Sequence, residues 1–355
     1  MADRVLTLRE LNRALLARQL LLRRARLPVA RAVERVGALQ AQWPPSPYVA
    51  LWSRLERFAR DDLDRAVRRR RLVKATLMRV TLHLVSTADY LAFAGLIRDA
   101  RRRAMERRAE RDGVVADVDG LVPRLLEVAS REPRSRPELL RLLGLPSLRV
   151  DDPRPWVVWH LLVARAELVH SPESSAWREH TSGGRFVPAR SWLGGEGATG
   201  DAAATALVRR YLGAFGPATR ADAAQWTGLA LGALEPGFAR LPLRRFLDER
   251  GRELYDLPRA PLPAADTVAP VRFLPLWDSA LLAHDDRTRI LPERYRGVVI
   301  QRNGTVRQTF LVDGFVAGTW RLERGRIALE PFEPLPARVR RDLEEEAARL
   351  AAFHA

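Results

Sequence analysis

One stretch in the first quarter of the chain reads LVKATLMRVTLHLVS, from Leu72 to Ser86. Residues that favour extended backbone recur along it, namely Val73, Thr76, Val80, Leu82 and Val85. The helical spacing of apolar residues that precedes this stretch is lost within it. We therefore expect two strands joined by a tight turn.

Four amphipathic helices are expected before this hairpin, because apolar residues recur there every three or four positions. They cover residues 6–22, 28–39, 48–58 and 61–69. The last has Asp61-Asp62 at its start and Arg68–Arg71 at its end, which complements the helix dipole. Helices followed by a two-stranded wing are the pattern of a winged-helix unit.

The same order recurs twice along the chain. A long basic helix at 87–111 ends the first set. The second set has helices at 118–130, 136–143 and 155–165, followed by strands at 168–171 and 185–188. A Gly/Ala-rich linker at 194–200 precedes the third set, with helices at 202–214, 219–227 and 229–239 and strands at 241–247 and 253–256.

From residue 271 onward the sequence has a pattern typical of β-strands. Strands are expected at 271–274, 297–302, 307–312, 315–321 and 326–329, with hairpin turns at Asn303-Gly304 and Asp313-Gly314, before a last helix at 338–351. The predicted fold class is α+β and mainly helical, with three tandem winged-helix motifs and a small C-terminal antiparallel β-barrel. The expected boundaries are 1–115, 116–195 and 201–265 for the winged-helix units, 266–335 for the barrel and 336–355 for the helix.

Composition narrows the class of protein. The chain has 355 residues, of which 47% are hydrophobic and 29% charged, as in soluble globular proteins. It has no apolar run of membrane-spanning length, no apolar leader and no cysteine, so we expect a cytoplasmic, nucleoid-associated protein without a membrane partner. The six histidines lack metal-ligand spacing, so no metal and no cofactor are expected.

Charge points to a polyanionic partner. The chain has 60 basic and 43 acidic residues, a net charge of +17, which makes nucleic acid the default partner. Lys74 is the only lysine, a bias typical of a GC-rich genome that explains the choice of arginine but not the excess of basic residues. Any one arginine cluster is best explained as a solvated helix face; together, within winged-helix-like units, they favour the backbone of duplex DNA. The clusters are Arg23-Arg24-Arg26, Arg68–Arg71, Arg101-Arg102-Arg103 and Arg107-Arg108-Arg111.

Two glutamines stand out in Leu39-Gln40-Ala41-Gln42-Trp43-Pro44, where an apolar helix is expected to meet a proline-rich break. A carboxamide cannot exchange a proton near neutral pH, so chemistry at this pair must depend on orientation and dipoles. Taken alone, the pair is best explained as the polar end of a helix.

Residues 8–330 resemble the AlkZ-type winged-helix DNA glycosylases, a family with three tandem winged-helix motifs and a C-terminal β-barrel. The matching stretches are 37–42, 46–55, 77–85, Tyr211 with 215–219, and Trp277-Asp278 with 284–287. Gln40-Ala41-Gln42 matches the family's catalytic Gln-apolar-Gln motif, whereas a sister branch has Asp at the second polar position. Val80 departs from the pattern, which more often has Gly there, and a β-branched residue suits a tight turn poorly.

The resemblance implies a monofunctional, metal-independent DNA glycosylase that works as a monomer in base excision repair. Its substrates would be cationic N3- or N7-alkylated purines in duplex DNA, with bulky adducts and interstrand crosslinks as further candidates. Gln40 and Gln42 would position the water. With Lys74 as the only lysine, a Schiff-base lyase step is not expected.

DNA contacts are expected from Arg69, Arg70, Arg79, His83, His284 and Arg287. For His83, a packed structural role is an equal alternative. The carboxylates of Asp285 and Asp286 are better explained as partners of Arg287 and Arg289 that fix a turn. Two other functions stay open: a non-enzymatic winged-helix DNA-binding protein such as a transcriptional regulator, and a family member that binds adducts without cleaving them.

Overall fold

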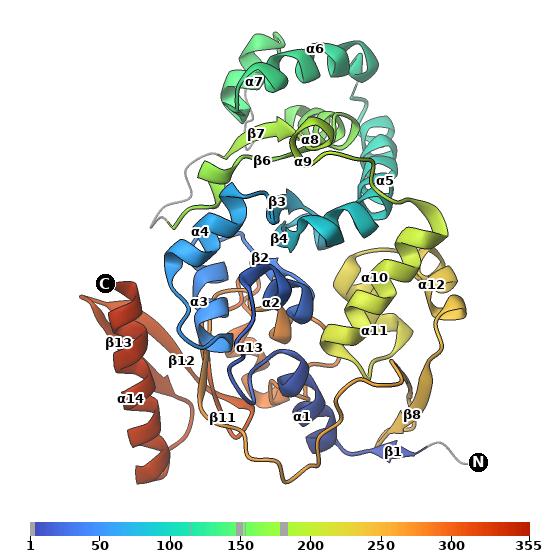
Figure 1. Cartoon of the computed structure of the whole chain (residues 1–355). Helices are drawn as coiled ribbons and strands as arrows, with labels where there is room; N and C mark the ends of the chain where they lie inside the picture. Colours follow the sequence, from blue (N-terminus) through green and yellow to red (C-terminus); the bar gives the residue numbers. More distant parts are fainter. Residues whose placement is uncertain (1–3, 115, 147–151, 153, 178–183) are drawn as a thin grey trace.

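The structure is a computed structural model that describes residues 4–114, 116–146, 152, 154–177 and 184–355. The first block carries the glutamine pair and the hairpin quoted above (Figure 1). Its elements are β1 (Val5–Leu6), α1 (Leu8–Arg18), α2 (Val29–Val36), β2 (Leu39–Gln40), α3 (Ser46–Arg54), α4 (Arg60–Arg68), β3 (Leu72–Thr76), β4 (Leu82–Ser86) and α5 (Thr87–Arg111).

Three further blocks follow along the chain. The second contains α6 (Val118–Arg131), β5 (Arg134–Ser135), α7 (Arg136–Leu142), α8 (Arg154–Arg165), β6 (Leu168–His170), β7 (Arg185–Pro188) and α9 (Ala189–Leu193). The third contains α10 (Gly200–Phe215), α11 (Arg220–Thr227), α12 (Glu235–Arg240), β8 (Arg244–Asp248) and β9 (Glu253–Asp256). The C-terminal block contains β10 (Arg272–Leu274), α13 (Arg296–Val299), β11 (Thr309–Val312), β12 (Phe315–Glu323), β13 (Arg326–Pro331) and α14 (Ala337–His354).

The strand pair expected at the end of each of the three sets is present, as β3–β4, β6–β7 and β8–β9, each antiparallel. The first two are joined into one sheet with the order β2-β4-β3-β6-β7-β5. The link between them is a single pairing, Lys74 on β3 with His170 on β6. The first and second blocks therefore share a sheet, and helix α8 lies beside its strands β6 and β7 (Figure 1).

The largest core cluster runs through the first, third and C-terminal blocks and takes in Val169 and Val187 of the second. It includes Leu15, Phe93, Tyr211, Trp226 and Leu281, each 0% exposed. The N-terminal segment joins the first block to the third: β1 pairs in parallel with β8, and α1 contacts α10. The second block has a separate core between α6, α7, α8 and its strands.

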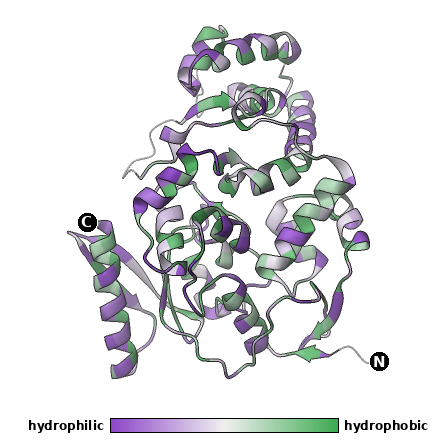
Figure 2. Cartoon of the chain, in the orientation of Figure 1, coloured by the Kyte–Doolittle hydropathy of each residue, from purple (hydrophilic) through white to green (hydrophobic). Residues whose placement is uncertain are grey.

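The C-terminal strands do not form the expected closed barrel. Among the described residues they make an open antiparallel sheet in the order β10-β11-β12-β13, with no pairing between β10 and β13. Closure is unnecessary because α14 packs against β13 and covers the apolar residues Phe310 and Trp320 with Leu343 and Leu350. In Figure 2 this helix carries alternating hydrophilic and hydrophobic bands, as expected for a helix with one buried face.

The strand expected at 297–302 is also wrong. This stretch holds the short helix α13, and only Ile300 makes an isolated bridge, with Val306. Val299 is 0% exposed, so one apolar residue anchors the turn in the core. The β-branched run Val298-Val299-Ile300 favours a strand by residue type, but here it lies at the end of a short helix and just after it.

Candidate active site

The glutamine pair lies on and just after a short edge strand, not at the helix end that the sequence indicates. Helix α2 ends at Val36 because Gly37 takes φ +90°, and a Cβ atom there would lie 3.0 Å from the Cβ of Ala214. The chain then becomes extended, and Gln40 pairs with His83 across β2 and β4. The Ala41 N–H donates to the Leu82 carbonyl at 2.7 Å, which continues the pairing by one residue.

The two carboxamides differ in exposure, but each is held by one hydrogen bond. Gln40 is 6% exposed, and its Oε1 accepts from Nη2 of Arg79 at 3.3 Å. Gln42 is exposed, and its Oε1 accepts from the Leu82 N–H at 3.3 Å. An amide oxygen has two lone pairs, so each keeps one for a further donor such as a water molecule.

The hairpin turn next to Gln40 does lie at Arg79-Val80. Both residues have left-handed backbone, with φ +52° and +58°, and the Leu77 N–H donates to the Thr81 carbonyl at 3.0 Å. A β-branched residue in this region costs about 1–3 kcal/mol. Val80 is 41% exposed, so little packing offsets that cost.

Arg79 points inward rather than toward solvent. Its Nη1 donates to the Trp226 carbonyl at the end of α11, and its Nη2 to Gln40. Burial, followed by the charge of Arg287, lowers the pKa of Arg79 to about 10, so the guanidinium stays protonated at neutral pH. The structure thus places a half-buried cation beside Gln40 and fixes the orientation of that amide.

His83 lies on the same side of the sheet as Gln40, its cross-strand partner. It is 0% exposed; its Nδ1–H donates to the Thr81 carbonyl at 3.0 Å, and its Nε2 has no partner among the described residues. Burial and the Arg79 charge lower the pKa of His83 to about 3, so the imidazole is neutral. The expected direct contact between His83 and DNA therefore has no support in this conformation.

His284 is likewise internal. It is 1% exposed, its Nε2–H donates to the Phe215 carbonyl at 3.0 Å, and burial lowers its pKa to about 3. The side chain of His284, like that of His83, is therefore not accessible for the expected contact with DNA. The buried imidazole instead ties the C-terminal block to α10.

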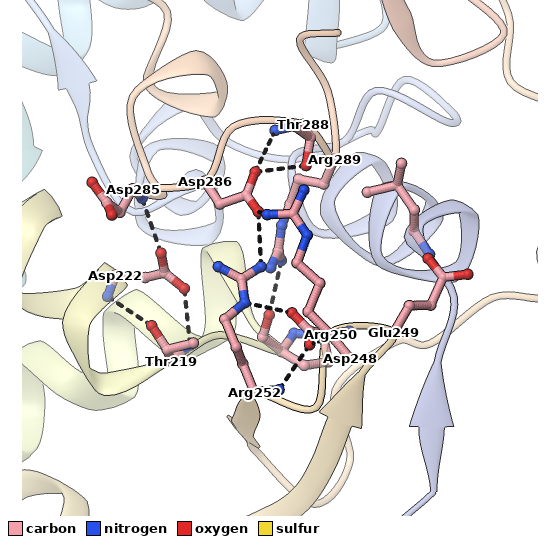
Figure 3. Close-up of polar contacts among 12 residues, drawn as sticks. Thr219, Asp222, Asp248, Glu249, Arg250, Arg252, Asp285, Asp286, Thr288 and Arg289 are labelled. Atoms are coloured by element: carbon pink, nitrogen blue, oxygen red, sulfur yellow. Dashed lines mark hydrogen bonds and ion pairs between the residues drawn. The ribbon is translucent and has the colours of Figure 1, made fainter. Parts of the chain in front are cut away.

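The acidic loop after His284 fixes a turn, as the alternative interpretation held, but through other partners (Figure 3). Asp286 accepts from Arg250 at 2.8 Å, from Arg252 at 2.9 Å and from its neighbour Thr288. The Asp285 N–H donates to Asp222 at 2.9 Å. The loop is thereby joined to the β8–β9 turn and to α11 of the third block.

Arg287 and Arg289 are therefore not the partners of these carboxylates. Arg289 is 4% exposed and donates to the Pro217 carbonyl at 2.8 Å. Arg287 is half-buried, and burial lowers its pKa.

A buried ion pair lies next to the segment that leads into β2. The sequence analysis did not predict this pair. Arg54 at the end of α3 makes two bonds to Asp278, of 2.8 and 2.9 Å, and both side chains are 1% exposed. The next residue, Ser279, donates from Oγ to the Ala38 carbonyl at 3.1 Å, two residues before Gln40. Trp277-Asp278 stood out in the sequence, but nothing there reveals a partner 224 positions away.

The arginine clusters divide into paired and unpaired members. Paired ones include Arg24 with Glu346, Arg26 with Glu56 and Arg102 with Glu106. Among the described residues, no ion pair engages the following exposed arginines: Arg68, Arg69 and Arg71 around the end of α4, and Arg103 and Arg107 on α5. Arg70 stacks on Trp192 with its guanidinium carbon 4.0 Å from the ring centroid, and donates to the Trp192 carbonyl at 3.0 Å.

A cleft of about 650 Å³ opens between the first and second blocks, with Gln42 in its lining. The first-block hairpin contributes one wall, and α7, α8, β6 and β7 contribute the other. Its lining residues are Gln42, Pro44, Lys74, Thr76, Val80, Leu82, Arg136, Pro137, Trp156, Trp159, His160, Val163, His170, Ser174, Gly184 and Phe186.

The described ranges contain no cluster of three or more histidine, aspartate or glutamate side chains that could hold a metal ion. In the same part of the chain, no helix is both long and apolar enough to cross a membrane.

The fold and the glutamine pair agree with a family of DNA repair enzymes. The family model described as "DNA glycosylase AlkZ-like" matches residues 33–353, so the chain belongs to the AlkZ-like DNA glycosylase family. The resemblance seen in the sequence is thereby confirmed, as is its coarse consequence, a DNA glycosylase that acts in DNA repair.

Two proteins of Streptomyces sahachiroi are similar to this chain. An interstrand DNA cross-link repair glycosylase is 27% identical over 329 residues, which cover 82% of this chain and 81% of the relative. The solved structure of DNA glycosylase AlkZ superposes with a TM-score of 0.82 at 23% identity, covering 98% of this chain and 97% of the other. At that identity the structural likeness establishes the fold.

Proposed function

We propose that this protein is a monofunctional, metal-independent glycosylase that hydrolyses the N-glycosidic bond of cationic N3- or N7-alkylated purines in duplex DNA. Bulky purine adducts and interstrand crosslinks are included among its substrates, in line with the name of the Streptomyces relative. The protein acts as a monomer in the cytoplasm, on the nucleoid. The observation that best supports this proposal is the pair Gln40 and Gln42. Each amide is oriented by a hydrogen bond to its Oε1, and that oxygen keeps a second lone pair for another donor.

In this mechanism the substrate supplies the leaving group. A purine alkylated at N3 or N7 carries a positive charge, so the bond from C1′ to the base breaks with its electron pair and leaves a neutral base. The protein then has to place a water molecule against C1′ and to stabilise oxocarbenium-like charge. The water oxygen bonds to C1′, and its proton passes to solvent.

Gln40 and Gln42 would receive hydrogen bonds from this water and aim its lone pair at C1′. Neither amide removes the proton outright, so normal, uncharged purines would stay intact. Arg79 restricts where the base can lie. Its guanidinium lies within hydrogen-bond distance of Gln40, and two positive charges repel each other. We therefore place the cationic base, before its bond to C1′ breaks, on the Gln42 side of the pair.

The duplex would be held by charge. The unpaired arginines at the end of α4, Arg69 among them, and those on α5 are free to contact phosphates, which position a duplex without reading its sequence. Arg70 is included as a contact at the edge of this surface, and Arg287, whose charge acts on Arg79, as a separate contact in the C-terminal loop. We assign Arg79, His83 and His284 to support of the site, because all three are turned inward.

The test is release of free base from duplexes that contain N7-methylguanine or N3-methyladenine, measured in single-turnover reactions. Release from both alkylated duplexes and none from an unmodified duplex is expected. Borohydride should trap no covalent complex, because Lys74 is the only lysine and is 6% exposed, with Nζ donating to the Ser174 carbonyl.

Two outcomes would favour the other functions. Tight binding of an alkylated duplex without any abasic product would indicate a protein that binds adducts without cleaving them. Preference for one short unmodified sequence, with no base release, would indicate a regulator.

A further inference from the structure

A groove of about 430 Å³ opens on the first block, between the start of α2, the loop after α3 and helix α4; we call it the α2–α4 groove. It lies at the end of the β3–β4 hairpin opposite the turn, since Arg71 in its lining directly precedes Leu72, the first residue of β3. Strand β3 then runs about 13 Å toward that turn, at about 3.3 Å per residue. Among the described residues, none lines both this groove and the cleft that contains Gln42, so the two are separate features.

The inner surface of the groove is apolar. Its apolar lining includes Leu27, Val29 and Ala30 around the start of α2, Leu55 and Phe58 after α3, and Ala66 on α4. Val29 and Leu55 are 8% and 5% exposed and form the base, whereas Leu27 is 40% exposed at the rim. An apolar side chain placed in the groove would remove the surface of Leu27 from water, which favours binding.

The charged residues around the groove leave a positive excess. They are Arg57, Arg65, Arg69 and Arg71, with Glu56 and Asp62. Both carboxylates are already paired, Glu56 with Arg26 and Asp62 with Arg65. The other three arginines are exposed, and no ion pair engages any of them in the part of the chain that the structure describes. Three cations without a paired carboxylate therefore surround an apolar base.

We propose that the α2–α4 groove docks an acidic peptide segment of a partner protein, one that carries a large apolar side chain beside its carboxylates. The apolar base would receive that side chain, and the carboxylates would accept hydrogen bonds from Arg57 and Arg71. Charge complementarity favours this occupant over a second copy of the chain, whose net charge of +17 would be repelled. The backbone of a duplex brings negative charge but no apolar side chain to cover Leu27. The proposal goes beyond the glycosylase function and does not depend on it, because neither glutamine takes part.

Arg69 and Arg71 are also among the proposed phosphate contacts, so the experiment has to separate a peptide from a duplex. Leu27 and Arg57 belong to the groove alone, and Leu27 has no charge that a phosphate could contact. Substitutions at these two positions therefore report on the peptide.

The test measures fluorescence anisotropy of two labelled synthetic peptides with the full chain. Each peptide has four aspartates followed by one variable residue, which is phenylalanine in one peptide and serine in the other. We expect the phenylalanine peptide to bind about tenfold more tightly, since burial of its side chain is favourable and about 1.4 kcal/mol corresponds to tenfold. Equal affinities of the two peptides would overturn the proposal, because charge alone would then explain the binding.

Variants locate the binding on the protein. Leu27→Ser should weaken binding of the phenylalanine peptide about fivefold through lost apolar contact, and Arg57→Gln about threefold through one lost exposed charge pair. The matched controls are Leu322→Ser on β12, where Leu322 is 41% exposed, and Arg209→Gln on α10, where Arg209 is exposed and has no ion pair within the described ranges. A loss in Leu27→Ser no larger than in Leu322→Ser would place the peptide elsewhere and overturn the proposal.

Affinity for an unmodified duplex, measured in the same variants, separates docking of a peptide from contact with DNA. Leu27→Ser should bind the duplex as well as Leu322→Ser does, because a leucine side chain makes no hydrogen bond to phosphate. If Leu27→Ser instead weakens duplex and peptide by the same factor, the groove is part of the DNA-binding surface and the proposal is wrong. Neither result depends on base release, so failure of the proposed glycosylase function would be seen separately.

Discussion

Removing the carboxylate that pairs with Arg54 tests how much the buried Arg54–Asp278 ion pair contributes to the stability of the fold around the glutamine pair. Asp278→Asn keeps the shape of the side chain but leaves the guanidinium uncompensated, with both partners 1% exposed in the parent protein. The guanidinium of Arg54 also donates to the Ala50 carbonyl and to Oε1 of Gln19, but both acceptors are uncharged and cannot compensate the cation. Breaking a buried pair in this way costs about 3–5 kcal/mol.

Urea unfolding followed by tryptophan fluorescence measures this loss. The matched control is Glu196→Gln, which breaks an ion pair with Arg190 whose side chains are 74% and 73% exposed and should cost less than about 1 kcal/mol. The double variant Arg54→Met, Asp278→Leu should recover most of the stability, since apolar residues of similar volume can replace a buried pair. A loss in Asp278→Asn no larger than in the control would refute the reasoning.

Two further predictions concern the hairpin. The folded pKa of His83, about 3, lies below its unfolded value of about 6.5, so the unfolded chain takes up the proton first and stability is lost as pH falls from 6.5 toward 3. Between pH 7 and 5 this one residue should contribute about 2 kcal/mol to that loss, and His83→Gln should reduce the pH dependence of the urea-derived unfolding free energy by that amount; an unchanged slope would argue against a neutral, buried imidazole. Val80→Gly should raise stability by up to about 1 kcal/mol, because relief of the left-handed β-branched backbone exceeds the added entropy of glycine, and a lower melting temperature would contradict this.

Long periodic elements were predictable from the sequence. The helix expected at 87–111 has those bounds, and its first turn is capped by the side chain of Ser86, which accepts from the Asp89 N–H. The hairpin at 72–86 was also predictable, since its period changes from helical to extended. The left-handed turn at Val80 lies where the family more often has Gly. A search of this sequence for glycine at left-handed positions would therefore not have found the turn.

Elements that depend on distant partners were not predictable. Strands β1 and β2 have two residues each, too few to show any period, and exist only because β8 and β4 offer an edge. The sheet of the C-terminal block stays open because α14 covers its apolar face. The sequence of these strands does not indicate whether they close into a barrel or are covered by a helix. The inward orientation of Arg79 follows from the approach of α11, which lies almost 150 positions away.

The glutamine pair was found from the sequence by its resemblance to a family, and its geometry was not. Two amides with the spacing of Gln40 and Gln42 indicate neither a strand nor a helix end on their own. The difference in their exposure arises because the strand ends after Gln40 and the chain turns outward at Gln42.

The most direct test of the account is base release by the variant Gln40→Ala, Gln42→Ala. The measurement is the single-turnover rate on a duplex with one N7-methylguanine, beside the affinity for the same duplex made resistant to cleavage. The account predicts a rate at least about a hundredfold lower, as for loss of oriented polar groups in other active sites, with affinity within threefold of the parent protein. An unchanged rate in this double variant would contradict the central claim that the two glutamines position the attacking water.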